Sequence, residues 1–346
     1  MGSSPAIPPG SGRREREVSP GFAAAFAAAA GPAGAVTFAK FMEIALYDPL
    51  IGYYFRPGRR IGRARGTDFF TAASLGSAFA ELVAEACVAL LEGRDPAAFT
   101  FVEIGAEPGS AGVGTAAAGR FGGVRTLRLG DPLKVSGPCV VFSNELFDAQ
   151  PFSRFVFRRG AWRELGVALH DGRLREVELS SPLPAFLPGT APEGYAIDAP
   201  SGAAALLEQV AAQPWTGLFA AIDYGKSWRE IAEEAPAGTA RAYRRHVLST
   251  DLLADPGEQD LTCHVCWDWL VAALVRRGFA DPVLESQEAF FVSRAGPAIR
   301  AAAEASAGRF DPKKFSILQL IHPSNMGRMF QVLHAARWNA KSLSEN

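Results

Sequence analysis

The sequence predicts an α/β protein: an open sheet with helices on both faces, preceded by a helical region and interrupted by a β-rich insertion. Three observations support this prediction. Short apolar runs end in glycine, asparagine or aspartate, as strands do at the ligand crevice of an open α/β sheet. Stretches with apolar residues at helical spacing alternate with these runs. The middle of the chain instead holds several strand-like runs joined by turn signals.

Composition narrows the function classes. Lys and Arg number 35 and Asp and Glu 36, so the formal net charge of −1 argues against a nucleic-acid binder held by bulk positive charge. Hydrophobic residues make up 48% of the 346-residue chain, enough for a sizeable core. Four cysteines do not suggest a disulfide framework, so we expect a reducing, cytoplasmic location. No apolar run reaches the ~18–20 residues needed for a membrane span.

The composition also divides the chain into regions. The first 20 residues are rich in Gly, Ser, Pro and Arg and are expected to form a disordered tail. For the rest of the chain we predict a helical region over 21–98 and an α/β core over 99–151 and 198–335. A β-rich insertion is predicted over 152–197 and a flexible tail over 336–346.

Periodicity and turn residues predict the individual elements. Helices are predicted over 37–47, 77–91, 203–212 and 265–277. Strands of the core are predicted over 99–104, 124–129, 139–143, 217–222 and 289–292. The segment 231–257 is predicted to be mostly loop. Within the insertion, Asp171-Gly172 is a strong hairpin signal between two strand-like runs.

The first motif with chemical meaning is Glu103-Ile104-Gly105, followed by Gly109. An apolar strand that ends in an acid and a glycine turn brings backbone close to a nucleotide cofactor, because glycine removes the side chain that would block it. An ordinary strand and turn, with glycines for geometry alone, explains the pattern equally well.

Other polar groups follow later strands. Asn144, Glu145 and Asp148 come directly after an apolar strand, where carboxylates can hold a cation, orient a guanidinium or amine, or accept a proton. Asn144 could equally cap a helix. Asp223-Tyr224-Gly225 ends another apolar run, where functional groups often gather. The structural alternative is a turn that Gly225 permits.

A further group precedes the helix predicted over 265–277. Asp260 and His264 stand there as candidate proton acceptors, although His264 could equally be a structural residue. Cys263 and Cys266 have Cys-x-x-Cys spacing, but the chain has no second pair to complete a zinc site, so no metal is predicted.

Taken in order, these strings resemble the MidA-like methyltransferase family over roughly residues 36–335. The matching strings are Ala45-Leu46-Tyr47-Asp48-Pro49, Gly52-Tyr53-Tyr54, Asp68-Phe69-Phe70-Thr71, Glu103-Ile104-Gly105, Asn144 through Pro151, Trp162-Arg163-Glu164, Asp223-Tyr224-Gly225, Asp260-Leu261-Thr262 with His264, and His322 through Gly327. An ordered series of this kind is far more specific than any one of its members.

The resemblance implies a class I, Rossmann-like methyltransferase sheet that uses S-adenosyl-L-methionine. The family's mitochondrial member is a respiratory complex I assembly factor that methylates an arginine on a protein partner, so a protein substrate is implied here, in the mitochondrial matrix if the chain is eukaryotic. The implied cofactor-binding residues are Asp68, Glu103, Gly105, Gly109, Asp131 and Asn144. The implied catalytic residues are Glu145, Asp148, Asp260 and His264. Glu145 with Asp148 would hold the guanidinium, and Asp260 or His264 would accept the proton.

The chain departs from the family in its cofactor half. Glu107 replaces the middle glycine of the usual Gly-x-Gly-x-Gly, which places a carboxylate near the methionine carboxylate of the cofactor. Asp131, at a spacing that suits a ribose ligand, is followed by only 13 residues before Asn144. Either the second strand and its helix or the third strand must be trimmed. In the second case Asp131 would bind ribose, and in the first it would lie nearer the adenine.

These departures motivate two alternatives. One is a methyltransferase-fold protein that has lost its cofactor and acts as a binding or assembly factor. The other keeps the chemistry but methylates a small molecule or lipid.

Overall fold

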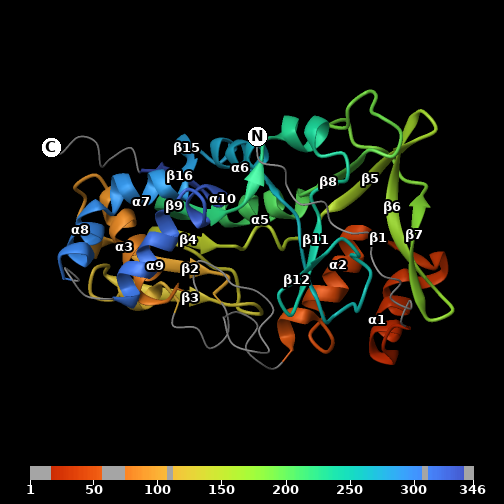
Figure 1. Cartoon of the computed structure of the whole chain (residues 1–346), viewed down its shortest axis with the longest axis horizontal. Coiled ribbons are helices and arrows are strands. Elements are labelled where there is room, and N and C mark those ends of the chain that lie inside the picture. The colour runs from red at the N-terminus through yellow and green to blue at the C-terminus, as the bar shows by residue number, and fades with distance from the viewer. Residues whose placement is uncertain (1–16, 57–74, 107–111, 306–310, 339–346) are drawn as a thin grey trace.

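A computed structural model describes residues 17–56, 75–106, 112–305 and 311–338. Two sheets organise these residues, and they lie side by side along the long axis of the molecule (Figure 1). The larger sheet, with most of the helices, lies on the left of that view, and the smaller sheet lies on the right with the first two helices of the chain.

The larger sheet has six strands, in the order β15-β16-β9-β4-β2-β3. Their bounds are β2 (Thr100–Ile104), β3 (Gly123–Leu127), β4 (Gly137–Asn144), β9 (Trp215–Asp223), β15 (Ala280–Ser286) and β16 (Gln331–Arg337). Strands β3, β2, β4 and β9 run parallel, β16 pairs antiparallel with β9, and β15 pairs antiparallel with β16. The carboxyl ends of four parallel strands therefore share one edge, as predicted for an open α/β sheet.

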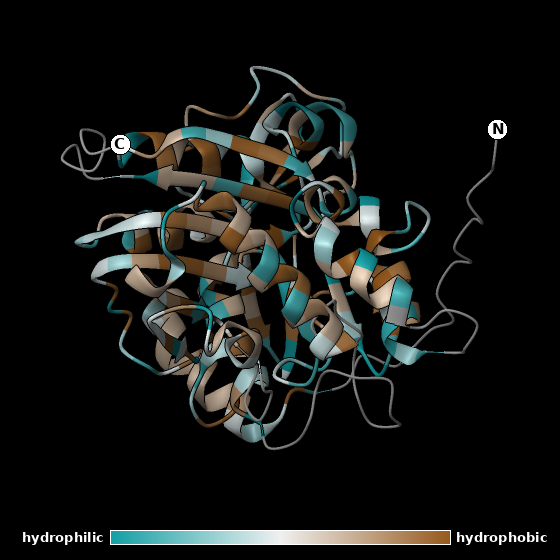
Figure 2. Ribbon diagram, turned by 90° about the vertical axis from the view of Figure 1, so that its left-hand side faces the viewer, coloured by the Kyte–Doolittle hydropathy of each residue, from teal (hydrophilic) through white to brown (hydrophobic). Residues whose placement is uncertain are grey.

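Both faces of this sheet are buried. Along β4, Val140 and Phe142 pack into one apolar cluster, while Cys139 and Val141 pack into another on the opposite face. Because side chains alternate across a strand, a strand covered on both sides must be apolar throughout. This requirement explains why β4 and β9 read as continuous hydrophobic runs. Figure 2 shows strands with brown, hydrophobic stretches among the helices.

Helices supply the two covers. One cluster packs under α3 (Ser77–Leu90), α4 (Gly114–Ala117), α7 (Gln287–Arg294), α8 (Gly296–Ala305), α9 (Pro312–Ile321) and α10 (Met326–Met329). The other packs under α5 (Ser201–Ala211) and α6 (Trp267–Arg276). The fold is thus the α/β class that the sequence predicted, with helices on both faces. Among the helices so described, none has the length and apolar character needed to span a bilayer.

The smaller sheet is antiparallel. It contains β1 (Ala35–Thr37), β5 (Ser153–Arg158), β6 (Ala161–His170), β7 (Arg173–Leu179) and β8 (Ala196–Ala199). Helices α1 (Pro20–Ala30) and α2 (Phe38–Tyr47) pack on it through a phenylalanine-rich cluster in which Phe38 stacks on Phe152 at 5.1 Å. The start of the chain and the insertion therefore form one lobe, while α3 packs on the larger sheet.

Several short elements complete the described fold. They are η1 (Gly31–Ala33), η2 (Tyr53–Phe55), η4 (Pro96–Ala98), β10 (Gly225–Lys226), the π-helical turn η5 (Glu230–Glu234), β11 (Arg241–Arg244), β12 (Val247–Ser249), β13 (Asp260–Thr262) and β14 (Val265–Cys266). Strands β12, β11 and β13 form a small sheet, and β10 pairs in parallel with β14.

Three sequence expectations need correction. The segment 289–292 is helical, in α7, because the Ser286 side chain accepts the Ala289 N–H at 3.1 Å and caps the helix. The stretch 231–257 is mostly loop, as predicted, but that prediction left out the hairpin β11–β12, whose turn residues Arg245 and His246 have φ of 50° and 63°. Strand β16 continues to Arg337, beyond the tail predicted from residue 336.

The structure also decides which strand of the nucleotide half is trimmed. The second strand is present as β3, which pairs with β2 at the edge of the sheet. Between β3 and β4 the described chain forms turns and irregular backbone, with no third strand. Helix α4, after the first strand, has only four residues. The third strand is therefore the one that this chain lacks.

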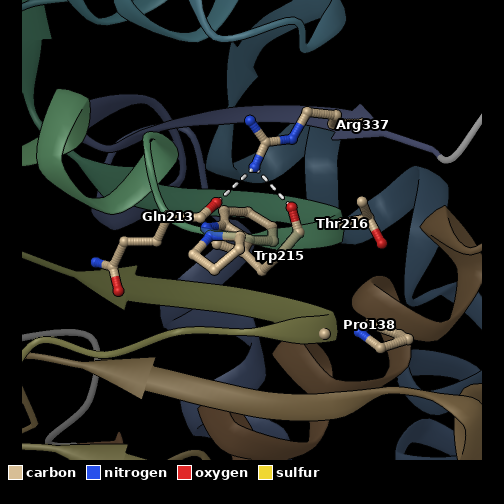
Figure 3. Close-up of a pocket in the computed structure, with 7 residues that line it drawn as sticks. Pro138, Gln213, Trp215, Thr216 and Arg337 are labelled. Atoms are coloured by element: carbon tan, nitrogen blue, oxygen red, sulfur yellow. Dashed lines mark hydrogen bonds between the residues drawn. The ribbon is translucent and has the colours of Figure 1, made fainter.

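A pocket of about 440 Å³ lies at the opposite, amino-end edge of β4 and β9, lined by Pro138, Gln213, Trp215, Thr216 and Arg337 among others (Figure 3). The Arg337 guanidinium lies in the wall of this pocket and holds the surrounding backbone. It donates to four backbone carbonyls, those of Ala211, Gln213, Trp215 and Arg277, at 2.6 to 3.2 Å. Two of these carbonyls stand where α5 and α6 end, so one cation satisfies the ends of both helices.

Replacing Arg337 with Ala should lower the free energy of unfolding by about 2–3 kcal/mol, because charged hydrogen bonds to several carbonyls are lost. Replacing it with Lys should cost about half as much, since an ammonium retains the charge without the planar fork. Urea denaturation measures both. Arg229→Ala is the control, because that side chain is 76% exposed and its loss should change stability by less than about 0.5 kcal/mol. Equal stability of the Arg337 and Arg229 variants would contradict the assignment.

Candidate active site

Polar and acidic side chains gather where the carboxyl edge of the large sheet meets the small lobe. Asn144 ends β4, Asp223 ends β9, and Asp260 begins β13. The backbone N–H of Cys263 donates to the Asp148 carbonyl at 2.9 Å, which joins the loop after β4 to the segment after β13. The structure thus brings together Asn144, Glu145, Asp148, Asp260 and His264, five of the residues that the sequence analysis singled out.

The loop after β4 leaves the strand through a strained residue. Glu145 has φ of 49°, a left-handed conformation that is uncommon for a non-glycine residue and is often found at functional sites. Its N–H donates to the Ile222 carbonyl at 2.9 Å, and the Asn144 side-chain amide donates to its carboxylate at 3.0 Å. The Asn144 Oδ1 and Ser143 Oγ atoms are buried with no partner among the described residues, so two polar atoms at the end of β4 are left for a ligand.

Asp223 fixes the position of this loop from the neighbouring strand. Its side chain is fully buried and accepts the backbone N–H groups of Phe147 and Tyr224, each at 2.9 Å. Burial, and then the nearby charge of Asp148, raise the pKa of Asp223 well above its ordinary value. Asp223 therefore holds the backbone of this loop in position.

Asp148 is the second buried carboxyl of the group, with 4% of its surface exposed. The hydroxyl of Tyr224 donates to Oδ2, while Oδ1 is buried without a partner in the described structure. Burial raises the pKa of Asp148 to about 6, and the hydrogen bond from Tyr224 limits that rise. The side chain is consequently mostly ionised at neutral pH and has one oxygen without a bond.

Two tyrosines of the small lobe close the site from the other side. Tyr54 donates to Asp260 Oδ1 at 2.9 Å, and Tyr47 donates to the Ala149 carbonyl at 2.8 Å. Their rings stack at 5.4 Å. Burial, followed by the charge of Asp260, raises the pKa of both phenols well above the ordinary value, so both remain proton donors.

His264 approaches the same cluster and is neutral at neutral pH. Burial lowers its pKa to about 4, with smaller contributions from the charges of Lys226 and Arg241. Its backbone N–H donates to Thr239 Oγ1 at 3.3 Å, and its ring meets Tyr224 edge to face at 5.6 Å. Nδ1 is buried without a partner in the part of the chain that the structure describes. A neutral imidazole of this kind can accept a proton.

Two of the residues predicted to bind the cofactor, Glu103 and Gly105, lie at the end of β2 and have different roles. Glu103, at the end of β2, turns its carboxylate to the N–H groups of Val113 and Gly114, at 2.9 and 3.3 Å. It therefore holds the end of the glycine-rich loop. Gly105 has φ of 83°, and a β-carbon there would lie 2.7 Å from Leu146 Cδ1, so only glycine fits.

The other three predicted cofactor residues contribute less evidence for a cofactor site. Asp131 is exposed, lies beyond the end of β3, and accepts the Arg128 N–H at 2.8 Å within its own turn. Gly109 and Asp68 lie outside the described residues, as does Glu107. A glycine turn next to buried polar atoms without partners at the end of β4 suits the close approach of a nucleotide cofactor.

Sequence reasoning missed the tyrosines as site residues, and it noted Asp223 and Tyr224 only as a strand end. The signal for Tyr224 was its place directly after a buried strand. For Tyr54 and Asp260, which are 206 residues apart, the sequence offered no pairing signal. The cysteines at 263 and 266 are buried and free, and no group of three metal-ligating side chains lies together within the described ranges.

Comparisons with known proteins bear on this geometry. Residues 128–280 match the family described as "Putative S-adenosyl-L-methionine-dependent methyltransferase". A "likely methyl transferase" from Burkholderia thailandensis, crystallised with S-adenosyl-homocysteine, is 28% identical, with 91% of each chain covered and a TM-score of 0.79. An uncharacterized Burkholderia thailandensis protein of the same superfamily is 26% identical, also with 91% of each chain covered, and has a TM-score of 0.75. Among curated proteins, none matches significantly.

The fold, the family match and the likeness over nearly the whole chain define the class. The chain is an S-adenosylmethionine-dependent methyltransferase with a Rossmann-like sheet, and S-adenosylmethionine is its cofactor. The sequence prediction of enzyme class and cofactor is confirmed at this level.

The buried carboxyls predict a pH-dependent stability. In the folded protein the pKa of Asp148 is about 6, above its ordinary value of 3.8, so the folded state binds this proton more tightly than the unfolded state does. The resulting contribution to stability is present at low pH and is lost as the pH rises through 6. Relative to wild type, Asp148→Asn should therefore gain stability on going from about pH 4 to pH 7, by roughly 2–3 kcal/mol. Urea unfolding across this range measures the difference, and a gap that does not change with pH would refute the raised pKa.

Proposed function

We propose that this methyltransferase transfers the methyl group to a nitrogen of an arginine side chain on a protein partner. The observation that carries the proposal is the gathering of carboxyl groups from three chain segments, with hydrogen-bond acceptors to spare, at the carboxyl edge of the sheet. A guanidinium presents five N–H donors and retains its charge, so it needs such a surplus of acceptors.

Glu145 and Asp148 are the proposed guanidinium ligands. Glu145 is held in place by its strained backbone and by the Asn144 amide, and Asp148 Oδ1 has no hydrogen-bond partner among the described residues. Two carboxylates fixed before the acceptor arrives can orient one of its nitrogens for in-line attack. Orientation is the main contribution required of the protein, because the sulfonium of S-adenosylmethionine supplies an already activated methyl group.

The released proton needs an acceptor. Methyl transfer to a guanidinium nitrogen forms a carbon–nitrogen bond, breaks the carbon–sulfur bond and liberates one proton. Of the two candidates, Asp260 already accepts the Tyr54 hydroxyl, whereas His264 is neutral with Nδ1 unpartnered in the described chain. We assign proton acceptance to His264, with Asp260 holding Tyr54 and the wall of the site.

On the cofactor side, the backbone at Gly105 would allow close approach, and Asn144 would offer Oδ1 at the end of β4. Glu103 would act indirectly, through the loop that it holds. With β3 present, Asp131 keeps its proposed role toward the ribose. The cytoplasm remains the proposed location.

Replacing Glu145 with Gln should lower kcat/KM for methyl transfer by about 10- to 100-fold, because a charged hydrogen-bonding partner of the guanidinium is lost. The assay is transfer of labelled methyl from S-adenosylmethionine to an arginine-centred peptide library, with a lysine-centred library as the comparison substrate. Glu92→Gln, whose side chain is 75% exposed, is the matched control. Undiminished transfer by the Glu145 variant would remove this residue from the site, and preferential labelling of lysine would reject arginine as the acceptor.

Calorimetry tests the cofactor half independently of any acceptor. S-adenosylmethionine should bind wild type with Kd of about 1–100 µM, roughly −8 to −5.5 kcal/mol. Glu145→Gln should retain that affinity, since its role is on the acceptor side. Millimolar or absent binding to wild type would instead favour the alternative of a cofactor-free binding or assembly factor. Binding without labelling of either peptide library would point to a small-molecule or lipid acceptor.

A further inference from the structure

Tyr224 makes contacts that the roles assigned so far do not explain. It follows β9, and its hydroxyl donates to Asp148 Oδ2 while accepting a hydrogen bond from Thr262. Its ring meets His264 edge to face at 5.6 Å and Phe330 at 5.9 Å. Its main chain is fixed as well, because its N–H donates to Asp223 and its carbonyl accepts the Val265 N–H at 3.2 Å.

We infer that Tyr224 is a positioning residue of this methyltransferase: its hydroxyl keeps Asp148 ionised and fixed in orientation, with one carboxylate oxygen left for the acceptor nitrogen. The inference rests on the acceptor role proposed for Asp148. Tyr224 acts through Asp148 and is not assigned any contact with the substrate.

Burial makes this bond necessary. A carboxylate with 4% exposure has lost its water, and only hydrogen bonds to its charged form can offset that loss. The side-chain donor that the structure gives it is the Tyr224 hydroxyl. The direction of this bond is fixed, because burial and the Asp148 charge raise the pKa of Tyr224 well above its ordinary value and the phenol retains its proton.

The backbone N–H groups of Ala149 and of Asp148 itself also favour the ionised carboxylate, by less than Tyr224 does. The ionisable side chains around Asp148 in the described structure are mostly acidic. Besides Tyr224, several ionisable residues interact electrostatically with Asp148 or with its acidic neighbours. They are Tyr47 of α2, Tyr54 of η2, Glu145 of the same loop, Asp223 of β9, Tyr243 of β11, Asp260 of β13 and Cys263. All are acids or weak acids, so none stabilises a negative charge by its own charge. Arg241 and Lys226 are the nearby cations, and their charges act on His264, that of Arg241 also on Tyr243.

Tyr224→Phe separates the bond from the packing, because the ring that contacts His264 and Phe330 remains. Loss of the donor raises the pKa of Asp148. The acidic limb of the kcat/KM profile for the arginine peptide should therefore move up by about one pH unit, with an approximately fivefold loss near pH 6 that approaches tenfold below about pH 5 and shrinks above about pH 8. A uniform loss at every pH, with the limb unmoved, would reduce Tyr224 to a structural role and overturn the inference.

The matched control is Tyr195→Phe. Tyr195 is also buried, but its hydroxyl bonds to backbone, accepting the Ala235 N–H at 2.9 Å and donating to the Ile231 carbonyl at 3.4 Å. Its loss should lower stability without moving the acidic limb. An equal shift in both variants would show that loss of any buried hydroxyl produces the effect, which would also overturn the inference.

A second readout does not need the acceptor. The infrared carbonyl band of protonated Asp148, taken as wild type minus Asp148→Asn, should titrate near pH 6 and move up in Tyr224→Phe. If wild type labels no arginine peptide, the proposed function fails, while this titration still decides whether Tyr224 controls the protonation of Asp148. An unmoved band would reject the inference even in an active enzyme.

Discussion

Burial of carboxyl groups at the carboxyl edge of the large sheet is the constraint on which the rest of this structure depends. Asp223, fully buried, is held by two backbone N–H groups, and one of them belongs to Phe147 in the loop that carries Glu145 and Asp148. A buried carboxyl without donors would cost several kcal/mol, so the loop and the strand end must keep their mutual geometry. The strained φ of Glu145 persists because these bonds over-determine the backbone around it.

The small lobe also takes part in this arrangement. The small lobe adds two phenol donors at this edge: Tyr54 reaches the carboxylate of Asp260, and Tyr47 reaches the carbonyl of Ala149. The lobe is anchored in turn by Asp198 of β8, which pairs with Arg154 at 2.7 Å and accepts the N–H groups of Thr239 and Ala240. Thr239 then holds the backbone of His264. The position of the proposed proton acceptor therefore depends on the inserted sheet.

Local patterns predicted much of this, and pairings distant in sequence account for the rest. Strand β4 and the residues after it were predictable, because a strand buried on both faces is a continuous apolar run and its polar end stands out. Strand β15 was not, since it is an irregular edge strand that contains Pro282 and leaves Val283 and Leu284 exposed. The hairpin β11–β12 was missed because Arg245 and His246 occupy turn positions where Asn and Gly give the usual signal. The Tyr54–Asp260 bond could not be predicted, because it joins residues that only the folded chain brings together.

The trimmed nucleotide half and the elaborate acceptor side are best understood together. The first helix after β2 is a single short turn, the third strand is absent, and Glu103 holds a loop instead of facing solvent. By contrast, the proposed acceptor side uses residues from α2, η2, β4, β9 and β13, linked by hydrogen bonds. A cofactor whose methyl group is already activated needs only a binding site that positions its sulfur. A guanidinium must be desolvated, paired and oriented before it can react. Under the proposed function, the distribution of structure in this chain follows that difference, because the hydrogen-bonded polar groups gather on the side assigned to the acceptor.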